Sequence, residues 1–144
     1  MKIIINDPAQ NEEESVVFNV RDISGNVLQA INLLKEPSSL TVYLDNQAAR
    51  LPAADIFYIE SVDLKTFVYA AKTVYRSRLK LYEVEEILDG GDFLRISKQI
   101  IVNIKKIRSV KPTGSSRFQA TLSNGEIVII SRQYVPALKE RFGL

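Results

Sequence analysis

From Leu40 onward the chain is a succession of short runs rich in β-branched, aromatic and aliphatic residues, separated by turn-forming sequences. Such runs occupy 41–44, 56–60, 66–70, 78–81, 93–96, 100–102, 117–122 and 127–130. They leave room for only a few short helices, whereas a parallel sheet needs a long crossover between successive strands. The pattern therefore predicts a compact, mainly β domain of antiparallel strands, and function is expected in its exposed loops.

Two features predict how this domain ends. Asn124-Gly125 lies between two strand-like runs and predicts a hairpin, because both residues tolerate a positive φ. Pro136 fits only the start of a helix, so we expect the last helix from about Pro136 to Phe142, with Gly143 just beyond it.

One short helix is predicted inside the β region, at 82–88. Val84, Ile87 and Leu88 have the spacing of a buried stripe, and Gly90 is placed to end the helix in a left-handed conformation. The intervening glutamates then point into solvent, so we expect no catalytic role for Glu83, Glu85 and Glu86. The run 89–92 has acidic residues, but it lacks the ligand number and spacing of a calcium loop.

Residues 1–38 have a different pattern, which predicts a small β-β-α extension ahead of a main domain at 39–144. Strands are expected at 2–6 and 16–20, and a helix at 23–34. A piece this small has little core of its own. We therefore expect it to pack on the rest of the chain or on a second copy, and its helix to support a homodimer.

The chain contains no cysteine and no histidine. Disulfides, thiolate nucleophiles and cysteine zinc sites are excluded, and the commonest general base and metal ligand are missing. We expect no catalytic residue, no metal ion and no cofactor. No apolar run approaches the roughly 18–20 residues that span a bilayer, and the N-terminus does not resemble a signal peptide, so the cytoplasm is the expected compartment.

Charge is distributed unevenly along the chain. Residues 1–60 hold four basic and nine acidic side chains, whereas residues 61–144 hold fifteen basic and eight acidic ones. Residues 93–135 hold eight basic side chains and a single acidic one, Glu126. This split favours a polyanionic partner for the basic half, and the alternative is a basic face that only keeps the protein soluble.

Residues 40–142 resemble the LytTR DNA-binding domain of bacterial response regulators and of shorter regulators. The resemblance lies in the order and spacing of the stretches Asp55–Ser61, Phe93–Lys98, Ile101–Ile104, the Asn124-Gly125 hairpin and Ser131–Tyr134, with Ile107 and Val110 between them. It implies a mainly β fold that is not helix-turn-helix. It also implies loops that enter successive grooves of double-stranded promoter DNA, and therefore a transcription regulator rather than an enzyme.

The resemblance also assigns candidate DNA-binding residues in three loops. The first loop, 63–66, contributes Lys65 and Thr66; the second, at the start of an expected short helix, contributes Ser97, Lys98 and Gln99; the third, before the last helix, contributes Ser131, Arg132 and Gln133. The family most often has arginine at both positions after the serine. Glutamine at 133 departs from that pattern, so its base preference is expected to differ.

The chemistry of these residues suits base reading. Arginine pairs with guanine, glutamine pairs with adenine, and backbone amides at a helix start suit a phosphate. Further cations are expected to make non-specific phosphate contacts: Lys105, Lys106, Arg108 and Lys111. The alternative interpretation makes Ser97 and Ser131 helix N-caps beside solvated charges. Asn103 is interpreted as a turn residue that hydrogen-bonds the backbone.

Two non-enzymatic alternatives remain at this point. The chain could bind RNA or single-stranded DNA by stacking bases on aromatic residues, namely Tyr58, Phe67, Tyr69, Tyr75 and Phe118. It could also be a protein-interaction module that uses its acidic N-terminal part. The sequence has no room for the phospho-accepting receiver domain of two-component regulators, and the family also suggests a small membrane protein as a possible partner.

Overall fold

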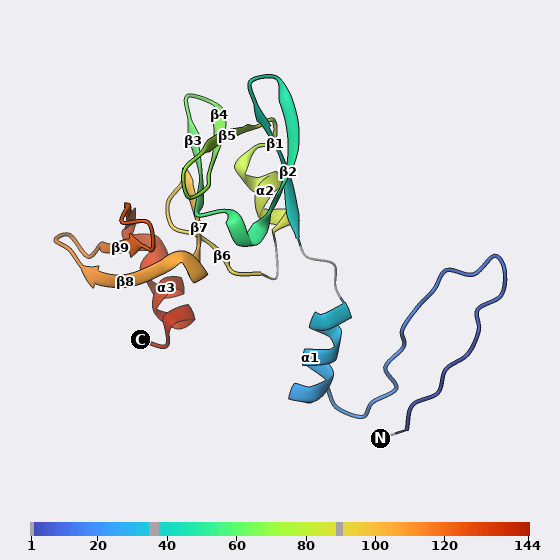
Figure 1. Cartoon of the computed structure of the whole chain (residues 1–144). Coiled ribbons are helices and arrows are strands. Elements are labelled where there is room, and N and C mark those ends of the chain that lie inside the picture. Colours follow the sequence, from blue (N-terminus) through green and yellow to red (C-terminus); the bar gives the residue numbers. More distant parts are fainter. Residues whose placement is uncertain (1, 35–37, 89–90) are drawn as a thin grey trace. The chain divides into compact units, whose positions relative to one another are not determined.

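The computed structural model describes residues 2–34, 38–88 and 91–144 (Figure 1). The chain divides into two compact units, residues 1–36 and residues 37–144. No helix in these described ranges is long and apolar enough to cross a membrane.

The first unit contains one helix, α1 (Gly25–Leu34), as predicted. Its first turn is capped by Ser24, whose hydroxyl accepts a hydrogen bond from the Val27 N–H at 3.4 Å. The strands expected at 2–6 and 16–20 are wrong, because the structure has no strand between residues 2 and 24 (Figure 1). The β-branched side chains there are exposed, and without a packed face such short runs do not hold a ladder.

The second unit confirms the predicted mainly β, antiparallel fold. Its larger sheet has seven strands in the order β2-β1-β5-β4-β3-β7-β6, and every pairing is antiparallel. The strands are β1 (Ser39–Leu44), β2 (Gln47–Pro52), β3 (Tyr58–Val62), β4 (Lys65–Tyr69), β5 (Val74–Ser77), β6 (Phe93–Arg95) and β7 (Ile100–Asn103). A short 3-10 helix, η1 (Ala53–Asp55), and the helix α2 (Leu81–Ile87) connect parts of this sheet.

The smaller sheet has three antiparallel strands in the order β10-β9-β8. They are β8 (Ile107–Pro112), β9 (Phe118–Leu122) and β10 (Ile127–Ile130). The 3-10 helix η2 (Ile104–Lys106) precedes this sheet, and η3 (Arg132–Tyr134) and α3 (Val135–Phe142) follow it. The last helix therefore ends where predicted, with Gly143 in the left-handed region at φ 70°.

Strand β7 separates two hydrophobic cores, because successive side chains of a strand point to opposite faces. Ile101 belongs to the core that includes Ile59, Val68 and Val84, whereas its neighbour Val102 belongs to the other. The second core lies under α3 and the small sheet and contains Phe57, Ile96, Ala120, Leu122, Val128, Ile130, Val135 and Leu138. Because side chains of β7 pack in both cores, the loops at the two ends of this strand are attached to a rigid element.

Helix α2 differs from its prediction by one position. The run 78–81 is not a strand: β5 ends at Ser77, and Leu81 begins the helix. The carboxylate of Glu83 accepts a hydrogen bond from the Lys80 N–H at 3.1 Å, which sets the start of the helix at that point. Leu81, Val84 and Leu88 are consequently the buried stripe, and Ile87, expected inside, is 47% exposed. Gly90 lies outside the described residues.

Two turn predictions are confirmed. The chain turns at Asn124-Gly125 between β9 and β10, with Gly125 at φ 89° and the Asn124 side-chain carbonyl accepting from the Glu126 N–H at 3.1 Å. Asn103 is 2% exposed and bonds only backbone: its carbonyl oxygen accepts from the Lys105 N–H at 3.1 Å, and its amide donates to the Ile56 carbonyl at 2.9 Å.

Candidate nucleic-acid interface

Residues 97–99 form a tight loop between β6 and β7, so the short helix expected there is wrong. The Ile96 N–H donates to the Ile100 carbonyl at 3.0 Å, which closes a strand-to-strand turn instead of a helical one. The Ser97 hydroxyl accepts a hydrogen bond from the Gln99 N–H at 3.2 Å, and so it stabilises this turn. The two side chains that follow Ser97 remain exposed.

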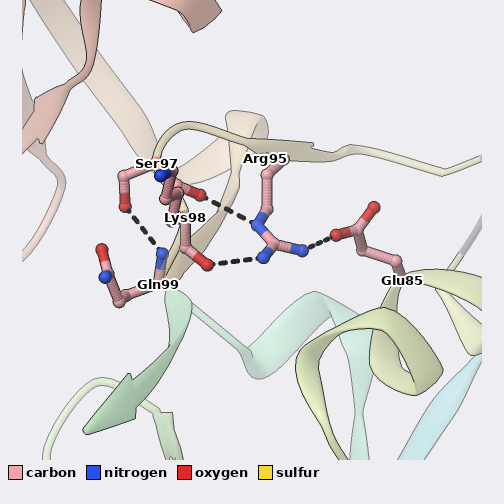
Figure 2. Close-up of polar contacts among 5 residues, drawn as sticks. All are labelled: Glu85, Arg95, Ser97, Lys98 and Gln99. Atoms are coloured by element: carbon pink, nitrogen blue, oxygen red, sulfur yellow. Dashed lines mark hydrogen bonds and ion pairs between the residues drawn. The ribbon is translucent and has the colours of Figure 1, made fainter.

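The side chain of Arg95 bonds this loop and holds it in place (Figure 2). Its Nε donates to the carbonyl of Ser97 at 2.8 Å, and its Nη2 donates to the carbonyl of Lys98 at 2.5 Å. Its Nη1 forms an ion pair with the carboxylate of Glu85 on α2. Because the guanidinium has fixed, planar donors, these bonds orient two consecutive peptide groups at once. Arg95 therefore positions the loop. By sequence alone it is simply one of the eight basic residues of 93–135 that could face a polyanion.

Two backbone hydrogen bonds join the three predicted loops. The Ser131 N–H donates to the Ile96 carbonyl at 2.8 Å, which ties the third loop to the second. The Ser61 N–H donates to the Gln99 carbonyl at 2.8 Å, which ties the end of β3, just before the first loop, to the other side of the second. Backbone hydrogen bonds thus join the segment around 97–99 to segments next to both of the other loops.

The second and third loops line one surface pocket of about 440 Å³. All of its lining residues are polar or basic, and none is acidic: Lys98, Gln99, Ser115, Arg117, Ser131, Arg132 and Gln133. Ser115 and Arg117 come from the loop between β8 and β9, and neither was among the residues predicted from the sequence. Arg117 lies within the basic stretch 93–135, and the neighbouring Gly114-Ser115-Ser116 was a recognisable loop sequence. The pairing of β8 with β9 carries this loop to the same end of the sheet as Ser131.

Ser131 occupies the N-cap position of η3, but its side chain makes no capping hydrogen bond. The turn is closed by the backbone instead, with the Tyr134 N–H donating to the Ser131 carbonyl at 2.9 Å. Arg132 and Gln133 are exposed, and both line the pocket. Their side chains are consequently placed at an accessible helix start, where the sequence analysis expected base-reading chemistry.

The first loop is a two-residue turn between β3 and β4. Lys65 is exposed, whereas Thr66 is 5% exposed and lies between Ser61 and Ser77 on the neighbouring strands. The Thr66 side chain therefore packs within the sheet. Neither residue lines the pocket of about 440 Å³, so the structure does not bring the first loop together with the other two at that pocket.

The four cations expected at phosphates do not lie together. Lys111 is near the pocket end of β8, whereas Lys105, Lys106 and Arg108 lie at the opposite end of the small sheet. Those three have partners within the chain. Lys105 pairs with the Asp92 carboxylate at 3.3 Å, the Lys106 ammonium lies 4.9 Å from the centre of the Phe57 ring, and Arg108 donates to the Ser123 carbonyl at 2.9 Å.

The aromatic residues that could stack bases are engaged within the fold. Tyr58 and Tyr69 stack on each other with ring centres 4.2 Å apart. Arg76 covers the ring of Phe67, Lys139 covers that of Phe118, and Tyr75 packs against the first core. Burial, reinforced by the Glu126 carboxylate, raises the pKa of the Tyr58 hydroxyl, and burial together with Glu60 raises the pKa of Tyr69. Open ring faces are what a single-strand platform needs, so this arrangement favours a structural role.

The glutamates of α2 do not converge. Glu83 accepts from the backbone at the start of the helix, and Glu85 pairs with Arg95. Within the described ranges, acidic side chains form no group of three or more that could hold a metal ion. Two of the carboxylates of this helix, those of Glu83 and Glu85, thus have structural partners.

Comparisons with known proteins bear on the family and the fold of the chain. The family model of the LytTr DNA-binding domain matches residues 46–143. A sensory transduction protein LytT of Enterococcus faecalis is 28% identical over 138 residues, which cover 92% of this chain and 57% of that relative. A Staphylococcus aureus NCTC 8325 protein named as an HTH-type transcriptional regulator is 25% identical over 138 residues, with 93% of each chain covered. A solved LytTr DNA-binding domain from Bacillus cereus superposes with a TM-score of 0.70 at 28% identity, covering 76% of this chain and all of that one.

Two of these facts limit what the relatives contribute. The chain spans little more than half the length of the Enterococcus LytT protein. The designation HTH-type does not describe the fold seen here, because in residues 38–88 and 91–144 the helices α2 and α3 are separated by the five strands β6–β10. The family model nevertheless covers well over half of the chain, and the solved domain shares its fold. The chain belongs to the LytTR DNA-binding domain family.

Proposed function

We propose that this chain is a transcription regulator that recognises specific sequences in duplex promoter DNA through its three linked loops. Family membership supplies DNA binding and transcription regulation. The proposal adds the location and the mode of reading. Lys98, Arg132 and Gln133 contact base edges or the phosphates beside them, and the first loop, with Lys65, reaches an adjacent groove.

The observation that carries this proposal is the convergence of separate chain segments on one basic, acid-free pocket. Among the described residues, the side chains of Lys98, Arg117 and Arg132 have no ion-pair or hydrogen-bond partner. A cation without an internal partner is available to a phosphate or to a guanine edge. Gln133 beside Arg132 offers the pairing geometry for adenine, so this loop combines two base preferences.

The proposal is tested by fluorescence anisotropy with the full chain. The probes are a duplex from upstream of the protein's own gene and a scrambled duplex of the same composition, each titrated at two salt concentrations. A triple variant, Lys98→Ala with Arg132→Ala and Gln133→Ala, is measured beside the wild type. Circular dichroism of the variant establishes that it is folded.

We expect preferential, salt-weakened binding of the wild type to the promoter duplex, and loss of that preference in the folded variant. The slope of log affinity against log salt should fall by about 0.9 for each phosphate contact removed. Equal binding of both duplexes by the wild type would mean that the chain attracts DNA only through a basic surface and has no sequence preference. Absence of binding to any promoter tested would favour the protein-interaction alternative.

We also propose that the N-terminal unit supports a homodimer through α1. Leu28 and Leu34 on this helix are 51% and 58% exposed, and Ile3, Ile5 and Val17 ahead of it are exposed as well. Apolar side chains of this kind are typical of surfaces that a second copy covers. A small membrane protein as a further partner stays a prediction from the family alone.

Sedimentation of the full chain should give the mass of a dimer, and Leu28→Glu with Leu34→Glu should give that of a monomer. Gln29→Glu on the same helix adds charge without removing apolar surface and should leave the dimer intact. A monomeric wild type at micromolar concentration contradicts this part of the proposal.

A further inference from the structure

The turn between β3 and β4 contains a leucine whose backbone conformation is unfavourable and whose side chain is unfavourably exposed to water. Val62 pairs with Lys65, so Asp63 and Leu64 are the two turn residues. Both have positive φ, 49° and 63°. Two-residue hairpin turns of this type favour asparagine, aspartate and glycine, because those residues tolerate the left-handed region.

The turn between β1 and β2 provides the internal comparison. Asp45 and Asn46 have φ values of 47° and 66°, so both turns hold their two central residues in the left-handed region. In the described part of the chain, six non-glycine residues have positive φ, and all except Leu64 are aspartate, asparagine or serine. A leucine at such a position adds steric strain between its Cβ and the backbone, which the Asp-Asn turn avoids.

The side chain of Leu64 is also fully open to water, with a relative exposure of 102%. Exposure leaves its apolar surface without compensation from packing. Strain in the backbone together with an uncovered apolar side chain at one position indicates a contact that is absent from the isolated chain.

The position of the turn indicates which partner makes that contact. Ser61, three residues before Leu64, donates its N–H to the carbonyl of Gln99 at 2.8 Å, and Gln99 lines the basic pocket. At about 3.3 Å per strand residue, the turn lies roughly 10 Å beyond that hydrogen bond. Exposed Lys65 follows directly and suits a neighbouring phosphate. Leu64 therefore continues the proposed DNA-binding surface.

We propose that Leu64 enters the major groove of the bound duplex and packs against the C5-methyl group of a thymine. The thymine methyl is the apolar group that base pairs present on the floor of that groove. A leucine at the tip of a rigid hairpin fits this group, whereas the Asp-Asn sequence of the other turn would not. This inference rests on the proposed DNA-binding function and adds a reading position to it.

The test combines a protein change with removal of the same methyl group from the DNA. Leu64→Asn converts the turn into Asp-Asn, the sequence of the β1–β2 turn, and is measured in the full chain. The probes are the preferred promoter duplex and the same duplex with every thymine replaced by deoxyuridine. Asn46→Leu is the matched control, because it places a leucine at a similar positive φ in a turn that is not one of the three loops.

We expect the affinity of the wild type to be about fourfold lower on the deoxyuridine duplex for each thymine methyl group that Leu64 touches. Leu64→Asn should bind the thymine duplex that much more weakly and respond little to the deoxyuridine change. Its melting temperature should rise, because the turn is relieved of strain. Asn46→Leu should melt at a lower temperature and keep the wild-type response to deoxyuridine.

The same deoxyuridine response in the wild type and in Leu64→Asn would overturn the inference while leaving the proposed function intact. A lower melting temperature for Leu64→Asn would overturn the strain argument. If the wild type does not distinguish the promoter from the scrambled duplex, the proposed function fails, and the inference fails with it.

Discussion

The two ends of the small β sheet carry similar numbers of basic residues but use them differently. At the end that holds the loops 113–117 and 131–133, the side chains of Arg117 and Arg132 line a pocket, and the described residues offer them no acidic partner there. At the other end, the three cations bond a carboxylate, an aromatic ring and a backbone carbonyl of the chain itself. A count of charges along the sequence does not distinguish these two ends.

From this difference we expect the partners of a cation, more than its charge, to decide whether it can contact DNA. A guanidinium that already donates to a carbonyl must exchange that bond for a phosphate, and the net stabilisation is small. A cation without an internal partner makes its phosphate contact without giving up a bond. The following predictions first test the loops at the pocket end and then compare single charges at the two ends.

Among single substitutions, the largest effect is expected at Arg95, which we expect to touch no DNA. Arg95→Ala removes the hydrogen bonds to the carbonyls of Ser97 and Lys98, so the middle loop loses its fixed geometry. At about 1.5–3 kcal/mol for a hydrogen bond to a charged group, promoter affinity should fall roughly tenfold to a hundredfold. Anisotropy titrations should show the fall with an almost unchanged salt slope, because no phosphate contact is removed.

Arg141→Ala is the control for that variant. Arg141 donates to the carbonyl of Gly91 at 3.0 Å, so its removal deletes the same charge and the same kind of bond elsewhere. Its promoter affinity should stay within about twofold of the wild type. A reduced salt slope in Arg95→Ala would identify Arg95 as a direct phosphate contact and contradict the positioning role.

Gln133→Arg tests base reading at the pocket end. Glutamine pairs with adenine and arginine with guanine, so the preferred base at one position of the site should change from adenine to guanine. The discrimination should be about 1–3 kcal/mol, and selection from a randomised duplex library would reveal it. An unchanged base preference together with stronger overall binding would mean that residue 133 contacts only the phosphate backbone.

Arg117→Ala compared with Arg108→Ala tests the contrast with one charge at each end. Arg117 is expected to contact a phosphate, so its removal should weaken binding severalfold and lower the salt slope by about 0.9. Arg108 is bonded to the Ser123 carbonyl, so its removal should leave both quantities nearly unchanged. Equal effects of the two substitutions would show that partnered and unpartnered cations contribute alike to DNA binding.

The smallest difference is expected between Lys111→Ala and Lys105→Ala. Lys111 lies on β8 near the pocket end, and its substitution should weaken binding about twofold to threefold by removing one peripheral phosphate contact. Lys105 is paired with Asp92, so its substitution should change affinity by less than that. Side-by-side titrations at low salt, where surface charges act at longest range, give the best resolution.

The fold was most predictable where local chemistry decides it. The hairpin at Asn124-Gly125 follows from φ preferences within two residues, and the last helix follows from Pro136 and Gly143. The predicted position of helix α2 was off by one residue. A buried stripe can include either Leu81 or Ile87 with equal apolar character, and only packing against the core beside β7 decides between them. The runs at 2–6 and 16–20 have strand propensity, but a strand also needs a neighbour, which no local pattern supplies.

The candidate site was predictable to a similar extent. The resemblance gave the loops 97–99 and 131–133, and the structure places both at one pocket. Arg117 was missed because its approach to Ser131 depends on the register of β8, β9 and β10. The support role of Arg95 depends on α2 bringing Glu85 against it, which is a contact between residues ten positions apart. The burial of Thr66 likewise depends on the strands beside it.

The most direct test of the account removes equal charges from the two ends. One variant combines Lys98→Ala, Arg117→Ala and Arg132→Ala, and the other combines Lys105→Ala, Lys106→Ala and Arg108→Ala, so each removes three positive charges. Promoter affinity is measured by anisotropy at one salt concentration for both. We predict a fall in affinity of about a hundredfold or more for the pocket-end variant and of less than about threefold for the far-end variant. Similar falls in two folded variants would contradict it, because they would show that total charge, and not the pocket, governs binding.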